Sequence, residues 1–113
     1  MYERFIEFGL LEALAAHRGV AIGYSAGAVI QLAEYHLSPD DDYPDFGYYR
    51  GIPYLDRFYL EVHYENTESQ NLSIQRVLAE KHKPVFATAQ DPGAIIVDDG
   101  RIRTLGDVRI FLP

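Results

Sequence analysis

A serine flanked by glycines marks the point where one predicted strand passes into a helix, and this junction constrains the fold of the chain more than any other feature. The motif GYSAG occupies residues 23–27, directly after an apolar run at 20–22 and directly before a helical pattern over 28–36. A short apolar run bounded by turn residues is typical of a buried parallel strand. A strand, a sharp turn and a helix in this order predict an α/β fold around a parallel sheet.

The segments on either side of this junction fit such a fold. Apolar residues repeat with helical spacing over 2–17, and Arg18 and Gly19 supply the cation and the glycine that commonly end a helix. Residues 38–51 are rich in proline and aspartate and predict an ordered loop. The alternation of apolar and polar residues over 58–63 predicts a strand.

The second half of the chain predicts one more helix and a terminal β-meander. Thr67 and Gln70 form a capping-box pattern for a helix that ends before Pro84. Short strands are expected at 85–88, 94–97, 101–105 and 108–112, with turns between them at 91–93, 98–100 and 106–107. The whole order predicts a single α/β domain over 1–113, with a parallel core and an antiparallel edge.

Composition excludes several classes of protein. The chain holds 10 Lys and Arg against 17 Asp and Glu, a net charge of −7, so we expect neither nucleic-acid binding nor binding to anionic membranes. It has no cysteine, which excludes a disulfide framework, a thiolate zinc site and a cysteine nucleophile. Its four histidines lack metal-site spacing, so we predict no metal and no cofactor. The absence of a long apolar stretch and of a basic leader favours a cytoplasmic protein.

The position of the GYSAG motif also bears on the reactivity of its serine. On a sharp turn between strand and helix, a serine adopts a strained backbone and its hydroxyl projects from the edge of the sheet. Gly23 and Gly27 are expected to let neighbouring segments approach Ser25, and the backbone N–H of Ala26 to face any oxyanion formed there. The pattern therefore predicts a nucleophilic serine, and a strand–helix turn without chemistry is the alternative.

A nucleophilic serine needs a base, and the sequence offers four histidines. His17 and His82 stand at predicted helix ends and are interpreted as solvated caps, and His36 ends the helix that begins at Ser25, about 15 Å away from it. His63 ends a predicted strand, at the edge of an open α/β sheet where sites form. We therefore predict His63 as the base. The acid that orients its ring stays open among the carboxylates Asp40, Asp41, Asp42, Asp45, Glu61 and Glu65.

Several segments of the chain resemble the dipeptidase E and cyanophycinase family of serine peptidases. They are GYSAGAVI at the turn, the acidic loop about fifteen residues after Ser25, the aromatic strand that ends in VHY at 62–64, and the closing segment PVFATAQDPGAIIVDDGRI. The resemblance implies a flavodoxin-like three-layer sandwich akin to class I glutamine amidotransferases. It also implies a triad of Ser25, His63 and Asp40, an oxyanion donor at Ala26, and short peptides, aspartyl dipeptides among them, as substrates.

The chain departs from that family in length and in charge. Family members are considerably longer, and the half that precedes the serine, with its first strands and a second oxyanion donor, is reduced here to one helix. The arginines that follow the family's histidine are replaced by ENTESQNLSIQ, so an aspartyl substrate would need Arg50, Arg57 or Arg76 as its cation. We therefore predict the C-terminal half of a peptidase E-like domain, associated with a second copy or with a separate polypeptide that carries the N-terminal half. A non-catalytic remnant or a split-gene subunit is the alternative.

Overall fold

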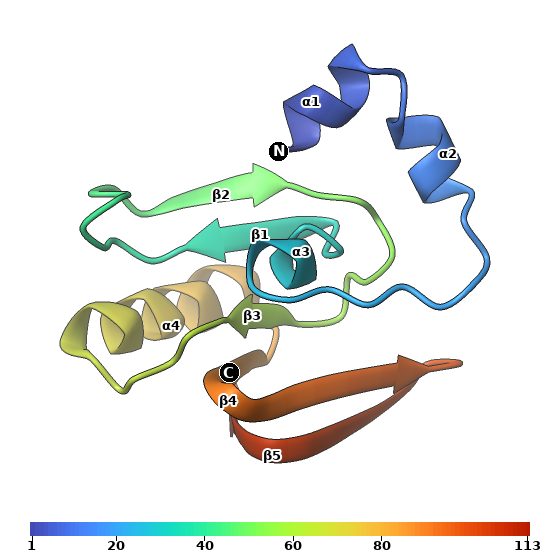
Figure 1. Cartoon of the computed structure of the whole chain (residues 1–113). Coiled ribbons are helices and arrows are strands. Elements are labelled where there is room, and N and C mark those ends of the chain that lie inside the picture. The colour runs from blue at the N-terminus through green and yellow to red at the C-terminus, as the bar shows by residue number, and fades with distance from the viewer.

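Three strands form the main sheet, and a helix connects the first two of them. Strand β3 (Tyr59–Glu61) lies parallel to β4 (Val85–Asp98), and β4 forms a long antiparallel hairpin with β5 (Arg101–Phe111). Helix α4 (Glu68–Lys81) makes the crossover from β3 to β4. Figure 1 shows the hairpin curling past the short β3, with α4 to one side of the sheet. This parallel β3–α4–β4 unit is the part of the predicted parallel core that the structure contains.

A separate two-stranded sheet lies beside β3, on the side away from the hairpin (Figure 1). Its strands are β1 (Glu34–Leu37) and β2 (Gly47–Arg50), which pair antiparallel. These elements come from a computed structural model that describes residues 1–113, except for the side chains of Gln90 and Asp91. The fold is therefore mixed α/β, with a curled mixed sheet and a separate antiparallel sheet.

The main sheet is buried on both faces at β3 and the start of β4. One face carries, together with α4, the buried residues Tyr59, Ile74, Val77, Leu78, Val85 and Ala87. The other face carries a second buried cluster, Val29, Leu32, Phe58, Leu60 and Phe86. Full burial of one large apolar side chain contributes about 1.5–3 kcal/mol, so these two clusters supply most of the stabilisation. The strand predicted within 58–63 is confirmed as β3, which is shorter than predicted and buried at all three of its residues.

Helix α4 begins at the capping box that the sequence predicts. The Gln70 backbone N–H donates to the Thr67 hydroxyl at 3.2 Å, and the Thr67 backbone N–H donates back to the Gln70 side chain. His82 ends the helix in the left-handed region, with φ of 56°. Because the cap is a local interaction among neighbouring residues, the sequence alone is enough to place it.

A polar network ties α4 to both sheets. The Tyr59 hydroxyl on β3 donates to the Glu34 carboxylate on β1, and Lys81 Nζ on α4 lies 2.8 Å from the same carboxylate. Burial, together with the hydrogen bond to Glu34, raises the pKa of Tyr59. The hydrogen bonds from Lys81 and Tyr59 lower the pKa of Glu34. These contacts fix β1, β3 and α4 relative to one another.

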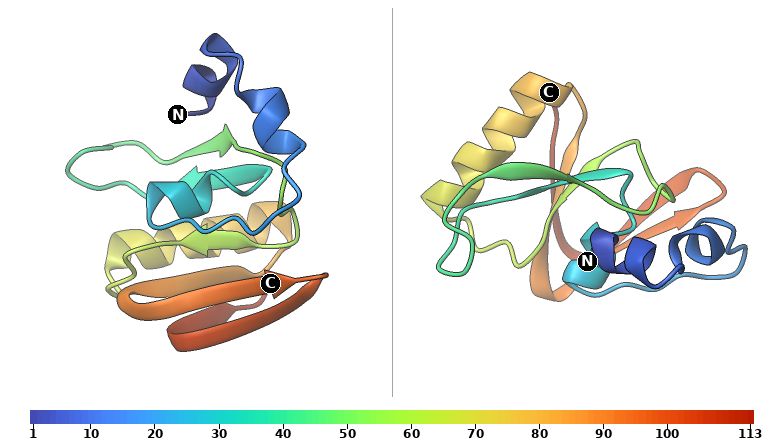
Figure 2. Two further views of the ribbon diagram at one scale, coloured as in Figure 1. Left: turned by 45° about the vertical axis from the view of Figure 1, so that its right-hand side comes forward. Right: turned by 90° about the horizontal axis from the view of Figure 1, so that it is seen from above.

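The single helix expected over 2–17 is wrong. The segment forms two short helices, α1 (Tyr2–Glu7) and α2 (Leu11–Ala15), because Gly9 adopts φ of +68° and interrupts the helical backbone. Neither helix buries a residue, and Figure 2 shows both set apart at one end of the molecule. None of the described helices is long and apolar enough to cross a membrane.

The apolar run at 20–22 does not form the predicted buried strand. Val20 is 84% exposed and Ile22 is 93% exposed, and the run holds no regular secondary structure. A strand is stable only where a neighbour completes its hydrogen bonds. No strand pairs with this run within the described chain. The segment enters the serine turn as an exposed, unpaired stretch.

The helix expected over 28–36 is also much shorter than predicted. Helix α3 (Ala26–Val29) ends after four residues, and the segment continues into β1. Pairing with β2 decides this outcome, because Tyr35 on β1 stacks on Tyr49 at 5.7 Å between ring centroids. The loop expected over 38–51 accordingly ends in a strand.

The predicted meander is a single long hairpin. Strand β4 continues through 91–93, where a turn is expected, with a shift of register between Thr88 and Gly93. Strand β5 continues through 106–107, where Gly106 has φ of +72° and an added Cβ would lie 1.5 Å from the Pro92 carbonyl oxygen. Glycine therefore marks a close approach between the strands here rather than a turn. The turn expected at 98–100 is confirmed, and Gly100 has φ of +78° there.

Candidate active site

Ser25 has the strained backbone that its motif predicts. It caps the N-terminus of α3 with φ of 55° and ψ of −118°, a region that side chains other than glycine rarely occupy. Such a residue costs on the order of 1–3 kcal/mol and persists only where the surroundings hold it. The Ala28 backbone N–H donates to the Ser25 carbonyl at 3.0 Å, and the Gly27 N–H donates to the Tyr24 carbonyl at 2.9 Å. The side chain of Ser25 remains partly exposed.

The two glycines of the motif have different surroundings. A Cβ added to Gly23 would lie 2.1 Å from the Gly27 carbonyl oxygen and 2.4 Å from Gln31 Nε2, so only glycine fits at this position. A Cβ added to Gly27 would meet no atom within 4 Å. The close approach expected at both glycines is therefore present at Gly23 and absent at Gly27.

His63 lies against the serine. Its Nε2 atom is 2.7 Å from Ser25 Oγ, although the two residues are 38 positions apart in the sequence. His63 follows the end of β3 with φ of 52°. The Gln70 side chain donates to the His63 carbonyl at 3.0 Å, and the Tyr24 ring meets the imidazole edge-on with centroids 6.1 Å apart. The capped end of α4 and the serine turn thus both position this ring.

The acid of the predicted triad does not contact His63. Asp40 Oδ1 accepts hydrogen bonds from the backbone N–H groups of Asp42 and Tyr43, at 2.9 and 2.7 Å, within an exposed turn. No carboxylate of the described side chains is hydrogen-bonded to His63. Asp40 and His63 nevertheless both line one cavity of about 320 Å³, here called the polar cavity, which Glu65 also lines. Asp40 as the orienting acid stays a prediction.

The remaining candidate acids fall into two groups. Glu61 is buried, and its Oε2 atom lies 2.6 Å from His36 Nε2 and accepts a 2.7 Å hydrogen bond from the Ser38 hydroxyl. The other loop carboxylates, Asp41, Asp42 and Asp45, are exposed and do not line the polar cavity. The sequence places His36 at the end of a long helix, whereas the structure places it in the core on β1. An acidic residue within an apolar strand, Glu61, is the signal that could have revealed this buried pair.

The Ala26 backbone N–H lies where the sequence places an oxyanion donor. It belongs to the residue directly after the serine, and it donates to no acceptor within the described part of the chain. A free N–H next to a nucleophile is the group that stabilises a tetrahedral oxyanion. Among the described residues, no group of three histidine or acidic side chains could hold a metal ion.

A second and larger cavity also borders the pair. This space, here called the apolar cavity, has a volume of about 540 Å³ and is lined by both Ser25 and His63. Phe58 and Leu60, which belong to the buried core, line it, and so does Ile22, which is exposed. A reacting group bound in this cavity would therefore face the serine hydroxyl.

Comparisons of the chain with protein-family models, with curated proteins and with solved structures found no match. The geometry of Ser25 and His63 is accordingly the basis for assigning a function.

Proposed function

We propose that this chain is a serine-type peptidase in which Ser25 is the nucleophile and His63 is the general base. The observation that carries the proposal is the 2.7 Å contact between Ser25 Oγ and His63 Nε2, together with the φ of 55° at Ser25. A hydroxyl held on a strained turn against an imidazole is the arrangement that activates a serine for attack. The segments that resemble dipeptidase E and cyanophycinase support a peptidase of that kind, built as part of a flavodoxin-like sandwich and acting on short peptides.

The proposed reaction begins when Ser25 Oγ attacks the carbonyl carbon of the peptide bond and His63 Nε2 takes the hydroxyl proton. The carbonyl oxygen becomes an oxyanion, which the Ala26 N–H stabilises. His63 then returns the proton to the leaving amine, and a water molecule activated by His63 hydrolyses the acyl-enzyme. In this scheme His63 Nδ1 carries a proton, which an acid in the polar cavity accepts as a hydrogen bond. Asp40 is the proposed acid.

A fluorophosphonate probe, which reacts with activated serines, tests the proposal. We expect labelling of the wild-type chain, none of Ser25→Ala, and a rate lowered by about 10²–10⁴ in His63→Ala, because that is the usual contribution of a general base. His17→Ala is the matched control, since His17 is exposed on the segment before the turn. Labelling that survives in Ser25→Ala, or a wild-type chain that does not react, would contradict the proposal.

The proposed acid has its own test. If Asp40 orients the His63 ring, Asp40→Asn lowers the labelling rate and shifts its pH profile, whereas Glu65→Gln, on the same polar cavity, leaves both unchanged. The opposite order of effects would assign the role to Glu65. Equal and negligible effects would exclude both Asp40 and Glu65 as the acid that orients His63.

A second candidate function is that of a non-catalytic remnant, or of a subunit that needs a partner. The exposure of Val20 and Ile22, at 84% and 93%, next to the serine turn favours it, because an unpaired apolar stretch can receive a strand from another chain. The partner would be a second copy or a polypeptide carrying the N-terminal half. Light scattering separates the cases: an active monomer contradicts this candidate, and an inactive chain that gains labelling when a partner is added supports it.

A further inference from the structure

The apolar cavity is lined by uncharged side chains throughout the part of the chain whose side chains the structure describes. Its lining includes the aliphatic or aromatic side chains of Ile22, Leu55, Phe58, Leu60, Ile95 and Val97. The polar groups of the lining are uncharged side chains and the imidazole of His63. No lysine, arginine, aspartate or glutamate of the described residues lines this space. A substrate group placed here contacts mainly hydrocarbon side chains.

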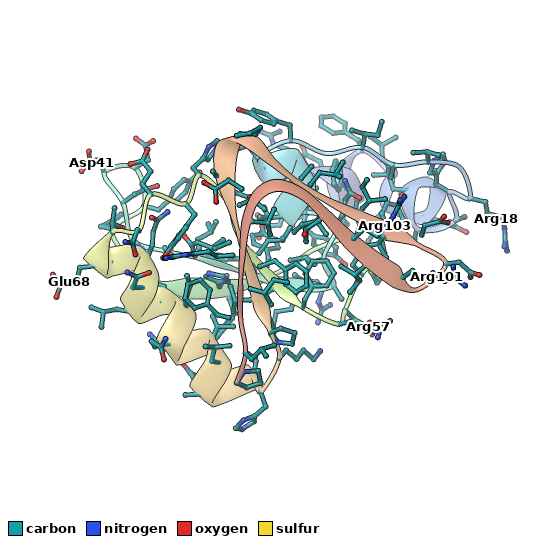
Figure 3. The ribbon with its side chains drawn as sticks, turned by 90° about the horizontal axis from the view of Figure 1, so that it is seen from below. Arg18, Asp41, Arg57, Glu68, Arg101 and Arg103 are labelled. Atoms are coloured by element: carbon teal, nitrogen blue, oxygen red, sulfur yellow. The ribbon has the colours of Figure 1, made fainter. Side chains whose placement is uncertain are left out.

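The arginines that an aspartyl substrate would need lie elsewhere. Arg57 donates to the Gly100 carbonyl at 2.9 Å, at the tip of the β4–β5 hairpin. Figure 3 shows Arg57 at the same end of the molecule as Arg18 and Arg101. Arg76 lies over the Phe46 ring at 4.2 Å from its centroid and pairs with Glu80. Arg50, on β2, is exposed and does not line the apolar cavity. A carboxylate in this cavity would therefore lose its hydration without gaining a cation.

We propose that the apolar cavity binds the acyl side of the substrate and selects an apolar, uncharged acyl group over an acidic one. This inference rests on the proposed function, because it takes Ser25 as the nucleophile. The volume of about 540 Å³ lies within the range of small-molecule sites and holds a short acyl chain or the side chain of a leucine residue. The substrates are thus short peptides or esters with an apolar acyl group, and aspartyl dipeptides are poor substrates.

Three p-nitrophenyl esters test this selectivity: the acetate, the butyrate and the hemisuccinate. Ser25 Oγ bonds to the carbonyl carbon while His63 takes the hydroxyl proton, and the ester bond then breaks so that p-nitrophenol leaves with that proton. Water then hydrolyses the acyl-enzyme, which releases the carboxylic acid and restores the serine. Butyrate and hemisuccinate have acyl groups of the same length that differ in one terminal carboxylate. Each buried methylene contributes a factor of about four, and butyrate has two methylenes more than acetate, so we expect its kcat/KM to be higher by about fifteenfold. We expect the hemisuccinate to be cleaved slower than the butyrate by about tenfold or more.

A charge placed at an exposed lining residue of the cavity provides the matched variant. Ile22 is 93% exposed, so Ile22→Lys leaves the core intact and adds the cation that the cavity lacks. We expect it to raise the hemisuccinate rate relative to the butyrate rate by about tenfold. Leu72→Lys, on the exposed side of α4, makes the same change of charge away from the cavity and leaves the ratio unchanged.

The outcomes separate this inference from the proposed function. If the fluorophosphonate labels Ser25 but the hemisuccinate is cleaved as fast as the butyrate, or Ile22→Lys leaves the ratio unchanged, the acyl selectivity is wrong and the serine chemistry stands. If Ser25 is not labelled and no ester is cleaved, both fall together. If the wild type prefers butyrate, and Ile22→Lys but not Leu72→Lys reduces or reverses that preference, the result supports both the acyl selectivity and the serine chemistry.

Discussion

One methyl group added at Gly23 has a larger effect on stability than the same group added at Gly27. In Gly23→Ala the new Cβ lies 2.1 Å from the Gly27 carbonyl oxygen, and real Cβ contacts are essentially never shorter than 3.0 Å. The segment before the serine and helix α3 must therefore move apart by about 0.9 Å. The obstructing atom belongs to the backbone, so no side-chain rotation relieves the contact. Such overpacking costs about 1–3 kcal/mol.

Gly27→Ala is the control with the opposite expectation. Its Cβ would meet no atom within 4 Å, and the residue lies inside helix α3, where alanine is favoured over glycine by about 0.5–1 kcal/mol. The two substitutions change the same number of atoms four residues apart. We therefore expect their free energies of unfolding to differ by about 1.5–4 kcal/mol, with Gly27→Ala the more stable.

Urea unfolding followed by circular dichroism measures this difference. With a slope of about 1–3 kcal/mol per molar urea for a small domain, the two midpoints differ by roughly 1 M. Because Gly23→Ala displaces the turn that holds Ser25 against His63, its fluorophosphonate labelling also slows, whereas Gly27→Ala is labelled like the wild type. Equal midpoints, or a less stable Gly27→Ala, would refute the reasoning that only Gly23 is sterically required.

Three further changes test other parts of the structure. Glu61→Ala removes the acceptor of one buried and one partly buried hydrogen bond and leaves His36 Nε2 without its partner in the core. Urea unfolding is expected to show a loss of about 2–4 kcal/mol, and a loss under about 1 kcal/mol contradicts the buried pair. Burial and Glu34 raise the pKa of Tyr59 above its ordinary value of 10.0. The stability that the neutral Tyr59 contributes is therefore complete below pH 10 and is lost as the pH rises further. Tyr59→Phe is expected to flatten the fall in the free energy of unfolding over that alkaline range, and an unchanged slope counts against the raised pKa. Ser25→Gly is expected to unfold at higher urea than Ser25→Ala, by about 1 kcal/mol, because glycine accepts the positive φ of this residue without strain; equal stability would show that the turn is relaxed.

The elements that the sequence predicts correctly depend on neighbouring residues. The capping box of Thr67 and Gln70 and the alternation over 58–63 are local patterns, and both α4 and β3 form where expected. Local patterns also predict a buried strand at 20–22. Whether this apolar run forms a strand depends on a neighbouring strand to pair with, and local sequence patterns do not show whether such a strand is present. The helical pattern over 28–36 fails for a related reason, since pairing with β2 converts its second half into a strand.

In the candidate site too, local features could be predicted from the sequence, whereas contacts that depend on distant segments could not. The serine turn and the strand that ends before His63 could be placed from their own residues. The two residues meet at 2.7 Å, although the run before Ser25 forms no strand. The acid could not be placed, because the Asp40 turn is held by its own backbone hydrogen bonds and its distance from His63 depends on how the loop packs. Glu61, two residues from His63, is engaged by His36, a partner that only the pairing of β1 reveals.

The helices that precede the serine turn make few contacts with the rest of the molecule, so the segment that contains them is accessible to a protease. Residues 1–24 include no buried side chain, and the Tyr54 hydroxyl, which donates to the Leu14 carbonyl, ties them to the body. Arg18 is exposed at the edge of the molecule, as Figure 3 shows, so trypsin can cut there without opening either core cluster. A chain trimmed at this point loses α1 and α2 and still contains both Ser25 and His63, so the proposed serine chemistry can be tested on the shortened chain as well.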